Sequence, residues 1–368
     1  MRGHGGGSRV GAAVVALLVG GLLLPGAAQA DEREWQVAAN PRATADELIG
    51  AGHAADIATS KDQMVVTWEV QPEDDEGPAQ GAWRLYDLER GEVADGTFGA
   101  VREASARIDV IAVRNGFLLT DYKKHALRFL DRSGKLSAAH LPEAKRGTSL
   151  AGGTLIEGDS EDRGTWKVIL PAKRQAVTLT DLPTTDVQGI ELTADGTVWV
   201  LLPWTGDGPF RIAHAKDGQA PWTTETIPIP EGSATDGGGL SASGERLFVV
   251  ASHENGASIG LDAILSREAD EEGWTTIDPS GIAGSLTSAP SIAVLPKDRL
   301  VAVSAGDGAW IERKDGDGWT PLQLPTADRQ TQLQVRAEGR WLWASEELSG
   351  NALYYSYDYG KTWHEFDR

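Results

Sequence analysis

The chain has 368 residues, no cysteine and a formal net charge of −20. The lack of thiols excludes disulfides, cysteine nucleophiles and thiolate zinc sites, and a chain of this length buries enough core to fold without cross-links. The acidic balance repels nucleic acid and anionic lipid, and it suits either a soluble exported protein or one with a basic partner.

The first thirty residues have the layout of an export signal. Arg2 and Arg9 precede an apolar run, Val10–Leu24. Ala28-Gln29-Ala30 then precedes two acidic residues. A basic start, a short apolar centre and a small-residue end are the three parts of a secretory signal. The run is shorter than the roughly 20 residues that span a bilayer. The sequence therefore predicts Sec-type cleavage after Ala30, a secreted, extracellular protein, and no stable membrane insertion.

After the leader, a repeated unit runs through the rest of the chain. Short β-branched and aromatic runs alternate with Gly, Asp, Asn and Pro turns, which is the all-β pattern. An apolar strand that follows a hairpin turn recurs at intervals of roughly 38 to 53 residues, within the range expected for four-stranded propeller blades. These second strands are predicted at Met64–Val70, Gly116–Tyr122, Gly153–Gly158, Thr197–Trp204, Arg246–His253, Arg299–Ala305 and Arg340–Glu346.

Three weaker strands complete each unit. The third strands are predicted at Trp83–Leu88, Leu127–Asp131, Trp166–Leu170, Phe210–Ala215, Ala263–Arg267, Ala309–Arg313 and Leu353–Tyr357. The outer strands often begin with tryptophan (Trp222, Trp274, Trp319 and Trp363) and end near proline, which suits a sheet edge. The inner strands are rich in small residues: Ala54–Ala58, Ile108–Val113, Leu150–Gly152, Val187–Leu192, Gly238–Ala242, Ser291–Leu295 and Leu333–Val335.

The predicted fold is an all-β β-propeller of about seven four-stranded blades, and six or eight blades also fit the pattern. Residues 46–368 form the single propeller domain, and residues 31–45 form an N-terminal segment. Within this segment Trp35–Ala38 reads like an outer strand that closes the ring by pairing with the last blade. The predicted units are 46–98, 99–142, 143–184, 185–231, 232–284, 285–327 and 328–368, and the first three are the least regular.

The last unit contains Ser356-Tyr-Asp358-Tyr-Gly360-Lys-Thr362-Trp363. This string resembles the Asp-box, or BNR repeat, of sialidase-like β-propellers, and partial echoes precede the tryptophans of the three units before it. The resemblance implies a structural role on the outer rim, away from any active centre. In such a turn Asp358 binds nearby backbone donors, Gly360 takes a positive φ, and Trp363 packs between sheets.

The resemblance also raises a sialidase hypothesis. Sialidases use an arginine triad, a tyrosine nucleophile with a supporting glutamate, and an aspartate acid/base. Arg107 and Arg336 lie on or beside inner strands, but no third such arginine and no inner-strand tyrosine is evident. The catalytic residues therefore stay unassigned. The sequence favours a binding or scaffold module without enzymatic activity, and a secreted sialidase-type glycoside hydrolase is the alternative.

Candidate ligand contacts gather where a propeller opens its central channel. Carboxylates beside an aromatic side chain favour a glycan, and a mouth rich in acids favours a basic protein or peptide. No cofactor is predicted, although Ca²⁺ suits the acidic runs Glu73–Glu76 and Asp159–Asp162. The protein is expected to be a monomer. The predicted ligand-binding residues are His53, Asp56, Arg107, Asp186, Trp204, Asp236, His253 and Arg336.

Overall fold

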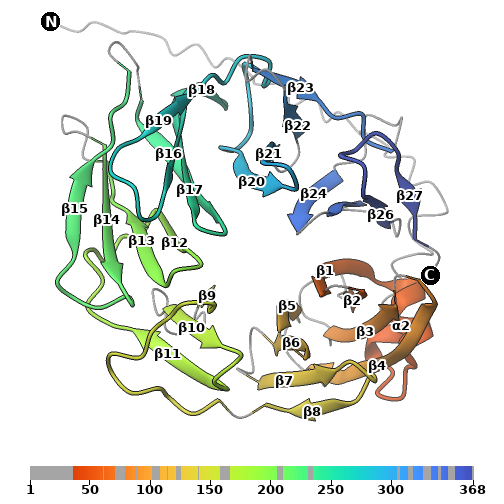
Figure 1. The fold of residues 1–368 in the computed structure, drawn as a ribbon. Coiled ribbons are helices and arrows are strands. Elements are labelled where there is room, and N and C mark those ends of the chain that lie inside the picture. The colour runs from red at the N-terminus through yellow and green to blue at the C-terminus, as the bar shows by residue number, and fades with distance from the viewer. Residues whose placement is uncertain are drawn as a thin grey trace, which may run out of the picture.

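In a computed structural model the chain forms a ring of seven antiparallel sheets around a central channel (Figure 1). The predicted seven-bladed β-propeller is therefore confirmed. Six of the sheets have four strands and one has three, and in each sheet the strands follow one another in chain order. The structure describes residues 36–60, 62–70, 79–87, 89–101, 108–113, 115–121, 126–139, 141–157, 166–204, 210–230, 235–304, 307–313, 318–325, 333–338, 341–346 and 353–366.

Blades 1 to 3 differ widely in the lengths of their strands. Blade 1 consists of β1 (His53–Ser60), β2 (Gln63–Val70), β3 (Ala79–Asp87) and β4 (Gly91–Val101). Blade 2 consists of β5 (Ile108–Val113), β6 (Gly116–Asp121), β7 (Ala126–Asp131) and β8 (Leu136–Ala138). Blade 3 consists of β9 (Thr154–Glu157), β10 (Trp166–Leu170) and β11 (Gln175–Leu179).

Blades 4 to 7 each have four strands, and the innermost strand comes first in the chain. Blade 4 consists of β12 (Gly189–Leu192), β13 (Thr197–Leu201), β14 (Arg211–Lys216) and β15 (Thr223–Thr226). Blade 5 consists of β16 (Gly237–Ser243), β17 (Arg246–Asn255), β18 (Ser258–Glu268) and β19 (Thr275–Ile277). Blade 6 consists of β20 (Ser291–Leu295), β21 (Arg299–Ser304), β22 (Gly308–Glu312) and β23 (Trp319–Pro321). Blade 7 consists of β24 (Leu333–Glu338), β25 (Trp341–Glu346), β26 (Leu353–Ser356) and β27 (His364–Glu365).

The N-terminal segment is helical, so the expectation of an outer strand at Trp35–Ala38 is wrong for the residues that the structure describes. Residues 36–39 form a helical turn, and α2 (Ala45–Ala51) follows. Thr44 and Glu47 form a capping box, a helix-start signature that local sequence carries by itself. The side-chain amide of Gln80 on β3 donates to the backbone oxygens of Ala38 and Asn40 at 2.6 and 2.7 Å, which holds the segment on blade 1.

The ring is closed by side-chain packing. All four strands of the last sheet come from the C-terminal part of the chain, and β27 is its outer strand. Leu48 and Ile49 of α2 share one buried cluster with Trp341 and Trp343 of blade 7. The first and last blades therefore meet through an apolar wedge, and no strand from the described N-terminal residues joins blade 7.

Blade 3 lacks the inner strand that was expected at Leu150–Gly152. These residues form a turn in which Gly152 has a φ of 69°. The chain instead reaches the blade along its outer edge, where Ala144 N donates to Ala176 O at 2.7 Å and Ala176 N donates to Pro142 O at 3.1 Å. The small residues that favour a crowded inner strand also permit a tight turn, so composition alone does not distinguish an inner strand from a turn.

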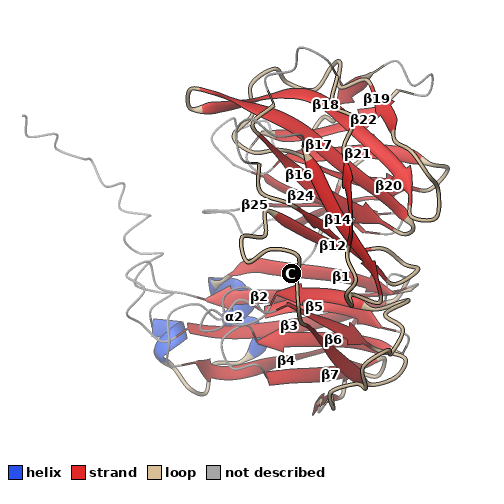
Figure 2. Cartoon of the chain, turned by 90° about the vertical axis from the view of Figure 1, so that its left-hand side faces the viewer, coloured by secondary structure: helices blue, strands red, loops and turns tan. Residues whose placement is uncertain are grey.

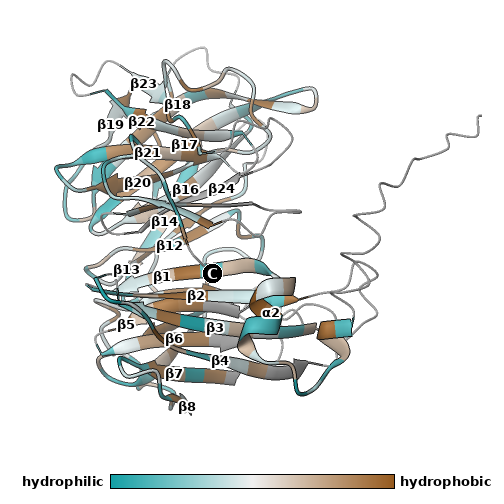
Figure 3. Ribbon diagram, turned by 90° about the vertical axis from the view of Figure 1, so that its right-hand side faces the viewer, coloured by the Kyte–Doolittle hydropathy of each residue, from teal (hydrophilic) through white to brown (hydrophobic). Residues whose placement is uncertain are grey.

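The core consists of apolar layers between neighbouring blades. Figure 3 shows hydrophobic positions along the strands of both halves of the ring. Four tryptophans stand at the starts of the outer strands of blades 4 to 7, as predicted: Trp222, Trp274 and Trp363 immediately precede β15, β19 and β27, and Trp319 begins β23. Each packs toward the preceding blade. The described residues contain no helix that is long and apolar enough to cross a membrane.

Candidate functional site

The two faces of the ring carry different connections. In an antiparallel blade, the connection between the second and third strands lies at the same end as the one that leads from the outer strand to the next blade. We call this end the upper face and the opposite end the lower face. Figure 2 shows that α2 and the β17–β18 hairpin protrude on one side of the ring, which is the upper face. Of the predicted ligand contacts, six belong to this face: His53, Asp56, Asp186, Trp204, Asp236 and His253.

The β17–β18 hairpin is the longest described feature of the upper face. Its strands remain paired up to Asn255 and Ser258, at the Gly256-Ala257 turn. A β-bulge lies where Ala251 pairs with Ala263 and Ser252 pairs with Leu261, which leaves Asp262 as the extra residue. A bulge reorients the side chain of its extra residue. Here the carboxylate of Asp262 approaches the ring of His253.

His253 and Asp262 form a fixed pair. His253 Nδ1 lies 2.9 Å from Asp262 Oδ1, and the side chains are 30% and 10% exposed. Thr235 Oγ1 donates to the other carboxylate oxygen at 2.6 Å, so both oxygens of Asp262 have partners. The carboxylate orients the imidazole and favours a proton on Nδ1, which directs Nε2 to a ligand as an acceptor.

Gly260 provides the space that the histidine occupies. A Cβ atom on this residue would lie 2.5 Å from His253 Cε1, closer than carbon atoms approach each other. Gly260 is also the cross-strand partner of His253. The imidazole therefore packs flat over the backbone of β18.

Asp236 joins the segment from blade 4 to the same hairpin. Both of its carboxylate oxygens accept from Glu254 N, at 3.0 and 3.1 Å, and its own N–H donates to Ser252 O at 3.0 Å. The exposed Glu254 therefore stands next to Asp236 and His253. The structure brings two of the predicted residues, Asp236 and His253, together on one blade.

The other predicted ligand contacts are spread around the ring. His53 is exposed at the start of β1, and Asp186 is exposed in the connection to blade 4. Trp204 is half-buried and packs into the cluster that contains Phe210 and Ile227, so it is not an open aromatic platform. Arg107 lies outside the described residues. For Arg336 the structure describes the backbone alone, on β24 opposite Trp343.

Several upper-face carboxylates hold backbone instead of facing solvent. Asp56 is 8% exposed and accepts from Val110 N of blade 2 at 2.8 Å. Asp307 accepts from Thr287 N at 2.7 Å and from Ser304 Oγ at 2.5 Å. Burial alone would raise the pKa of Asp307, but these hydrogen bonds outweigh it and hold that pKa below its ordinary value. Asp56 was predicted as a ligand contact, and its position here is that of a link between blades.

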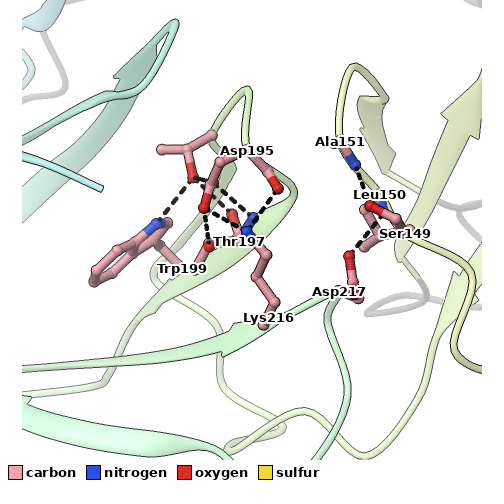
Figure 4. A network of polar contacts seen from close by, with 9 residues as sticks. Ser149, Leu150, Ala151, Asp195, Thr197, Trp199, Lys216 and Asp217 are labelled. Atoms are coloured by element: carbon pink, nitrogen blue, oxygen red, sulfur yellow. Dashed lines mark hydrogen bonds and ion pairs between the residues drawn. The ribbon is translucent and has the colours of Figure 1, made fainter. Parts of the chain in front are cut away.

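A second polar cluster, around Asp195, lies on the lower face (Figure 4). Thr193 Oγ1, Thr197 Oγ1 and Lys216 Nζ donate to its carboxylate at 2.7 to 2.8 Å. Burial acts to raise the pKa of Asp195, and these donors together hold it well below the ordinary value. Because these donors occupy both of its oxygens, the Asp195 carboxylate stabilises the β12–β13 turn.

The same turn region anchors the entry to blade 3. Leu150 N donates to Asp217 Oδ1 at 2.9 Å (Figure 4). Gly152 N donates to Ala194 O at 3.1 Å. Ala194 N in turn donates to Gly244 O of blade 5 at 2.8 Å. The lower turns of three successive blades are therefore tied together, which compensates for the inner strand that blade 3 lacks.

The turn at Ser356–Trp363 is held by hydrogen bonds of the Asp358 and Ser356 side chains. Asp358 Oδ1 accepts from Lys361 N at 3.1 Å, from Thr362 N at 2.9 Å and from Ser356 Oγ at 2.9 Å. Gly360 has a φ of 75°, and its N–H donates to Ser356 Oγ at 2.9 Å. Trp363 Nε1 donates to Gln323 O of the preceding blade at 2.9 Å. The aspartate, glycine and tryptophan thus stabilise the hairpin and its seam.

The placement of lysine and arginine differs between the two faces from residue 180 onward. The described upper-face connections, 180–188, 202–204, 227–230, 235–236, 278–290, 307 and 322–325, contain several aspartates and no lysine or arginine. Arg211, the first residue of β14, is a cation at the upper end of a strand. The described lower-face turns of blades 4 to 7 contain Lys297, Arg313 and Lys361 together with a larger number of acids, so both faces are acidic. The described upper-face connections differ in having carboxylates without neighbouring lysine or arginine.

Sequence reasoning missed Asp262 and Thr235. The third strand of blade 5 was predicted to begin at Ala263, whereas β18 begins at Ser258. The Gly256-Ala257 pair is the signal that could have extended the hairpin, because glycine at the first central position is typical of two-residue hairpin turns. The acidic runs proposed for Ca²⁺, Glu73–Glu76 and Asp159–Asp162, lie outside the described residues. Within the described residues no group of three or more His, Asp or Glu side chains is placed to hold a metal ion.

Comparison with known proteins shows the fold alone. Neither a protein-family model nor a curated protein matches the chain. A puromycin-hydrolysing peptidase of Mycobacterium tuberculosis is similar in structure, with a TM-score of 0.50 and 14% identity over 88% of this chain and 54% of its own. An acylaminoacyl peptidase of Pyrococcus horikoshii has a TM-score of 0.49 and 10% identity over 86% of this chain and 52% of its own. The chain thus spans about half the length of these proteins.

Proposed function

We propose that this chain is a secreted binding propeller whose upper face takes a basic segment of a protein or peptide, with the β17–β18 hairpin as its main contact. The observation that supports this is the absence of lysine and arginine from the described upper-face connections after residue 180, where Asp186, Asp236 and Asp307 lie. Complementary charge of this kind increases association rates and selects partners more than it adds affinity.

The hairpin supplies acceptors of the right chemistry. Glu254 is exposed, Asp236 stands beside it, and His253, whose side chain is 30% exposed, is held through Nδ1 by Asp262. An ammonium or guanidinium group needs acceptors alone, and these three side chains provide them at the upper end of the hairpin, whereas Arg246 and Arg267 lie at its lower end. A glycan has less support, because Trp204 is packed into the core of the seam.

The Asp-box resemblance and export are parts of the same proposal. The hydrogen bonds of Asp358 and Gly360 support an Asp-box in blade 7, and the residues before 36, which contain the predicted signal, lie outside the described part of the chain. A structural box on the outer rim leaves the upper face available for binding. Because a fold does not determine a function, the binding assay is decisive.

The test compares two charge reversals on blade 5. Glu254→Lys changes the upper face, and Glu272→Lys makes the same change at an exposed position in the lower turn between β18 and β19. A fluorescein-labelled peptide of alternating arginine and glycine is titrated by anisotropy, with a glutamate-glycine peptide as its control. We expect Glu254→Lys to weaken binding about tenfold and Glu272→Lys to change it less than about twofold.

Three outcomes would reject the proposal. Equal weakening by both variants would indicate non-specific attraction to an acidic protein. No binding of the basic peptide at 0.15 M NaCl would exclude the class of ligand. Selective binding on a glycan array, lost in Glu254→Lys but with no response to the peptide, would replace the basic ligand by a carbohydrate.

A further inference from the structure

A pocket of about 370 Å³ lies between blades 2 and 3. Blade 2 contributes one wall with Val113, Leu118 and Phe129 from three successive strands, and Ile169 of β10 forms part of the opposite wall. Leu118 and Ile169 are fully buried at its base. The volume falls within the range of about 300 to 1,000 Å³ that is typical of small-molecule sites.

The pocket occupies a place that tryptophans fill elsewhere in the ring. In blades 4, 6 and 7 the indole at the start of the outer strand packs against the preceding blade. Its Nε1 donates to a backbone oxygen that follows that blade's outer strand, at 2.8 Å for Trp222, 2.9 Å for Trp319 and 2.9 Å for Trp363. We call these side chains the wedge tryptophans.

Blade 3 has an arginine where the wedge tryptophans stand. Arg174 immediately precedes β11, just as Trp222, Trp274 and Trp363 immediately precede their outer strands. It has a φ of 52° and is exposed at the mouth of the pocket. Ala139 and Leu141, which follow the outer strand of blade 2, line the other side. The pocket is therefore a wedge site that no side chain of the described residues fills.

The lining specifies the chemistry of a ligand. Arg174 is the one charged side chain among the described lining residues, and its guanidinium has no hydrogen bond or ion pair with another described residue. The half-buried ring of Phe129 and the aliphatic groups around it suit a flat apolar group. A guanidinium binds a carboxylate through two parallel hydrogen bonds and does so better than an ammonium group.

We propose that this pocket binds a free aromatic carboxylate of one or two rings. The ring occupies the wedge site between the blades, and the carboxylate pairs with Arg174 at the mouth. The site is distinct from the upper-face hairpin, because it lies in the seam between blades 2 and 3 whereas the hairpin belongs to blade 5. The protein would therefore carry a small-molecule site separate from the surface proposed for its basic partner.

The test uses three probes that share one ring system. Indole-3-acetate carries a carboxylate, tryptamine carries an ammonium group and indole carries no charge. By isothermal titration calorimetry with the full mature chain, we expect indole-3-acetate to bind at least about tenfold more tightly than tryptamine, with indole in between. This order of affinities would show that both the apolar wall and the charge of Arg174 contribute to binding.

Variants place the binding in the pocket. Arg174→Gln removes the charge, and we expect about tenfold weaker binding of indole-3-acetate with no change for indole. Arg90→Gln is the matched control, since Arg90 is an exposed arginine immediately before the outer strand of blade 1. Leu141→Trp fills the pocket and should abolish binding of all three probes. If Leu141→Trp fails to fold, the comparison of the two glutamine variants still decides.

Three results would overturn the proposal. Tryptamine binding as tightly as indole-3-acetate would exclude the carboxylate. Equal affinities in wild type, Arg174→Gln and Leu141→Trp would place any binding elsewhere. Binding of a peptide with a C-terminal tryptophan, with none of the free acid, would assign the pocket to a peptide end.

Discussion

Blades 4 to 7 and blades 1 to 3 follow the same strand order but join their neighbours by different means. Between blades 3 and 4, 5 and 6, and 6 and 7, the indole N–H of a wedge tryptophan bonds the backbone of the preceding blade. Between blades 1 and 2, Gln63 Nε2 donates to Arg132 O at 2.9 Å, and Arg132 Nε donates back to Gln63 Oε1 at 3.0 Å.

Three seams have neither arrangement. Between blades 4 and 5, Trp274 packs against blade 4, but its buried indole N–H has no hydrogen-bond partner among the described residues. The seam between blades 7 and 1 is filled by α2 and an aromatic cluster, and the seam between blades 2 and 3 holds the pocket at Arg174. The difference shows that a tryptophan at the start of the outer strand gives a blade its regular contact with the preceding blade. Where that tryptophan is absent, the chain uses a side-chain amide, inserts a helix or leaves a cavity.

The largest expected effect comes from removing a wedge tryptophan. Trp319 is fully buried and bonds Asp278 O at 2.9 Å, so Trp319→Ala should lower the free energy of unfolding by about 3 to 5 kcal/mol. Trp222→Ala should cost less, because that side chain is half-buried. Urea unfolding followed by circular dichroism measures both changes. Equal losses for the two variants would mean that burial of the indole does not determine the strength of the seam.

A smaller effect is expected in the inner ring. Glu191 lies on β12, the first inner strand after blade 3, and on the same side of that strand as Gly189, which faces Leu240 of blade 5. Burial raises the pKa of the Glu191 carboxyl to about 8. Among the described residues no partner compensates for its loss of hydration, so the ionised form is disfavoured in the folded chain.

The sign of the pH dependence follows from this pKa. Because the folded-state pKa is raised, the carboxyl costs little below the unfolded value, and stability falls as the pH rises toward about 8. Glu191→Gln should therefore stabilise the protein by about 1 to 2 kcal/mol at pH 9 and by much less at pH 5. Glu272→Gln, at an exposed lower turn, is the control. A stability gain that is the same at both pH values would rule out titration of Glu191.

Much of the fold follows from local chemistry. The second strands were predictable because β-branched runs follow hairpin turns such as Asp195-Gly196, where Gly196 has a φ of 91°. The wedge tryptophans were predictable because a bulky aromatic at a sheet edge must be covered by a neighbour. The inner strand of blade 3 was wrongly predicted, since Leu150–Gly152 is short and small, and its path depends on distant bonds to Asp217 and Ala194.

The candidate site was harder to predict than the fold. Asp236 and His253 could be placed on the upper face by counting strands, but Asp262 reaches His253 only through a bulge. Sequence also gives no distinction between a carboxylate that binds backbone and one that faces a ligand. Asp56 is of the first kind because Val110 of the next blade donates to it, a contact between residues 54 positions apart.

The smallest expected effect is at the seam between blades 1 and 2. Arg132 and Asp62 form an ion pair whose side chains are 47% and 53% exposed. Water screens such a pair and its ordering costs side-chain entropy, so a double-mutant cycle of Arg132→Gln and Asp62→Asn should give a coupling of about 0.2 to 0.5 kcal/mol. In 0.5 M NaCl the coupling should shrink further, because exposed charges are screened by salt.

The remaining contribution of Arg132 should come from Gln63, which is 6% exposed and therefore loses a partner in a buried seam. The variant Arg132→Gln should thus destabilise the chain more than Asp62→Asn does, and the excess should not depend on salt. If salt abolished the whole effect of Arg132→Gln, the amide contact would contribute nothing. The seam between blades 1 and 2 would then depend on apolar packing and on the backbone contacts made by Asp56 and Gln63.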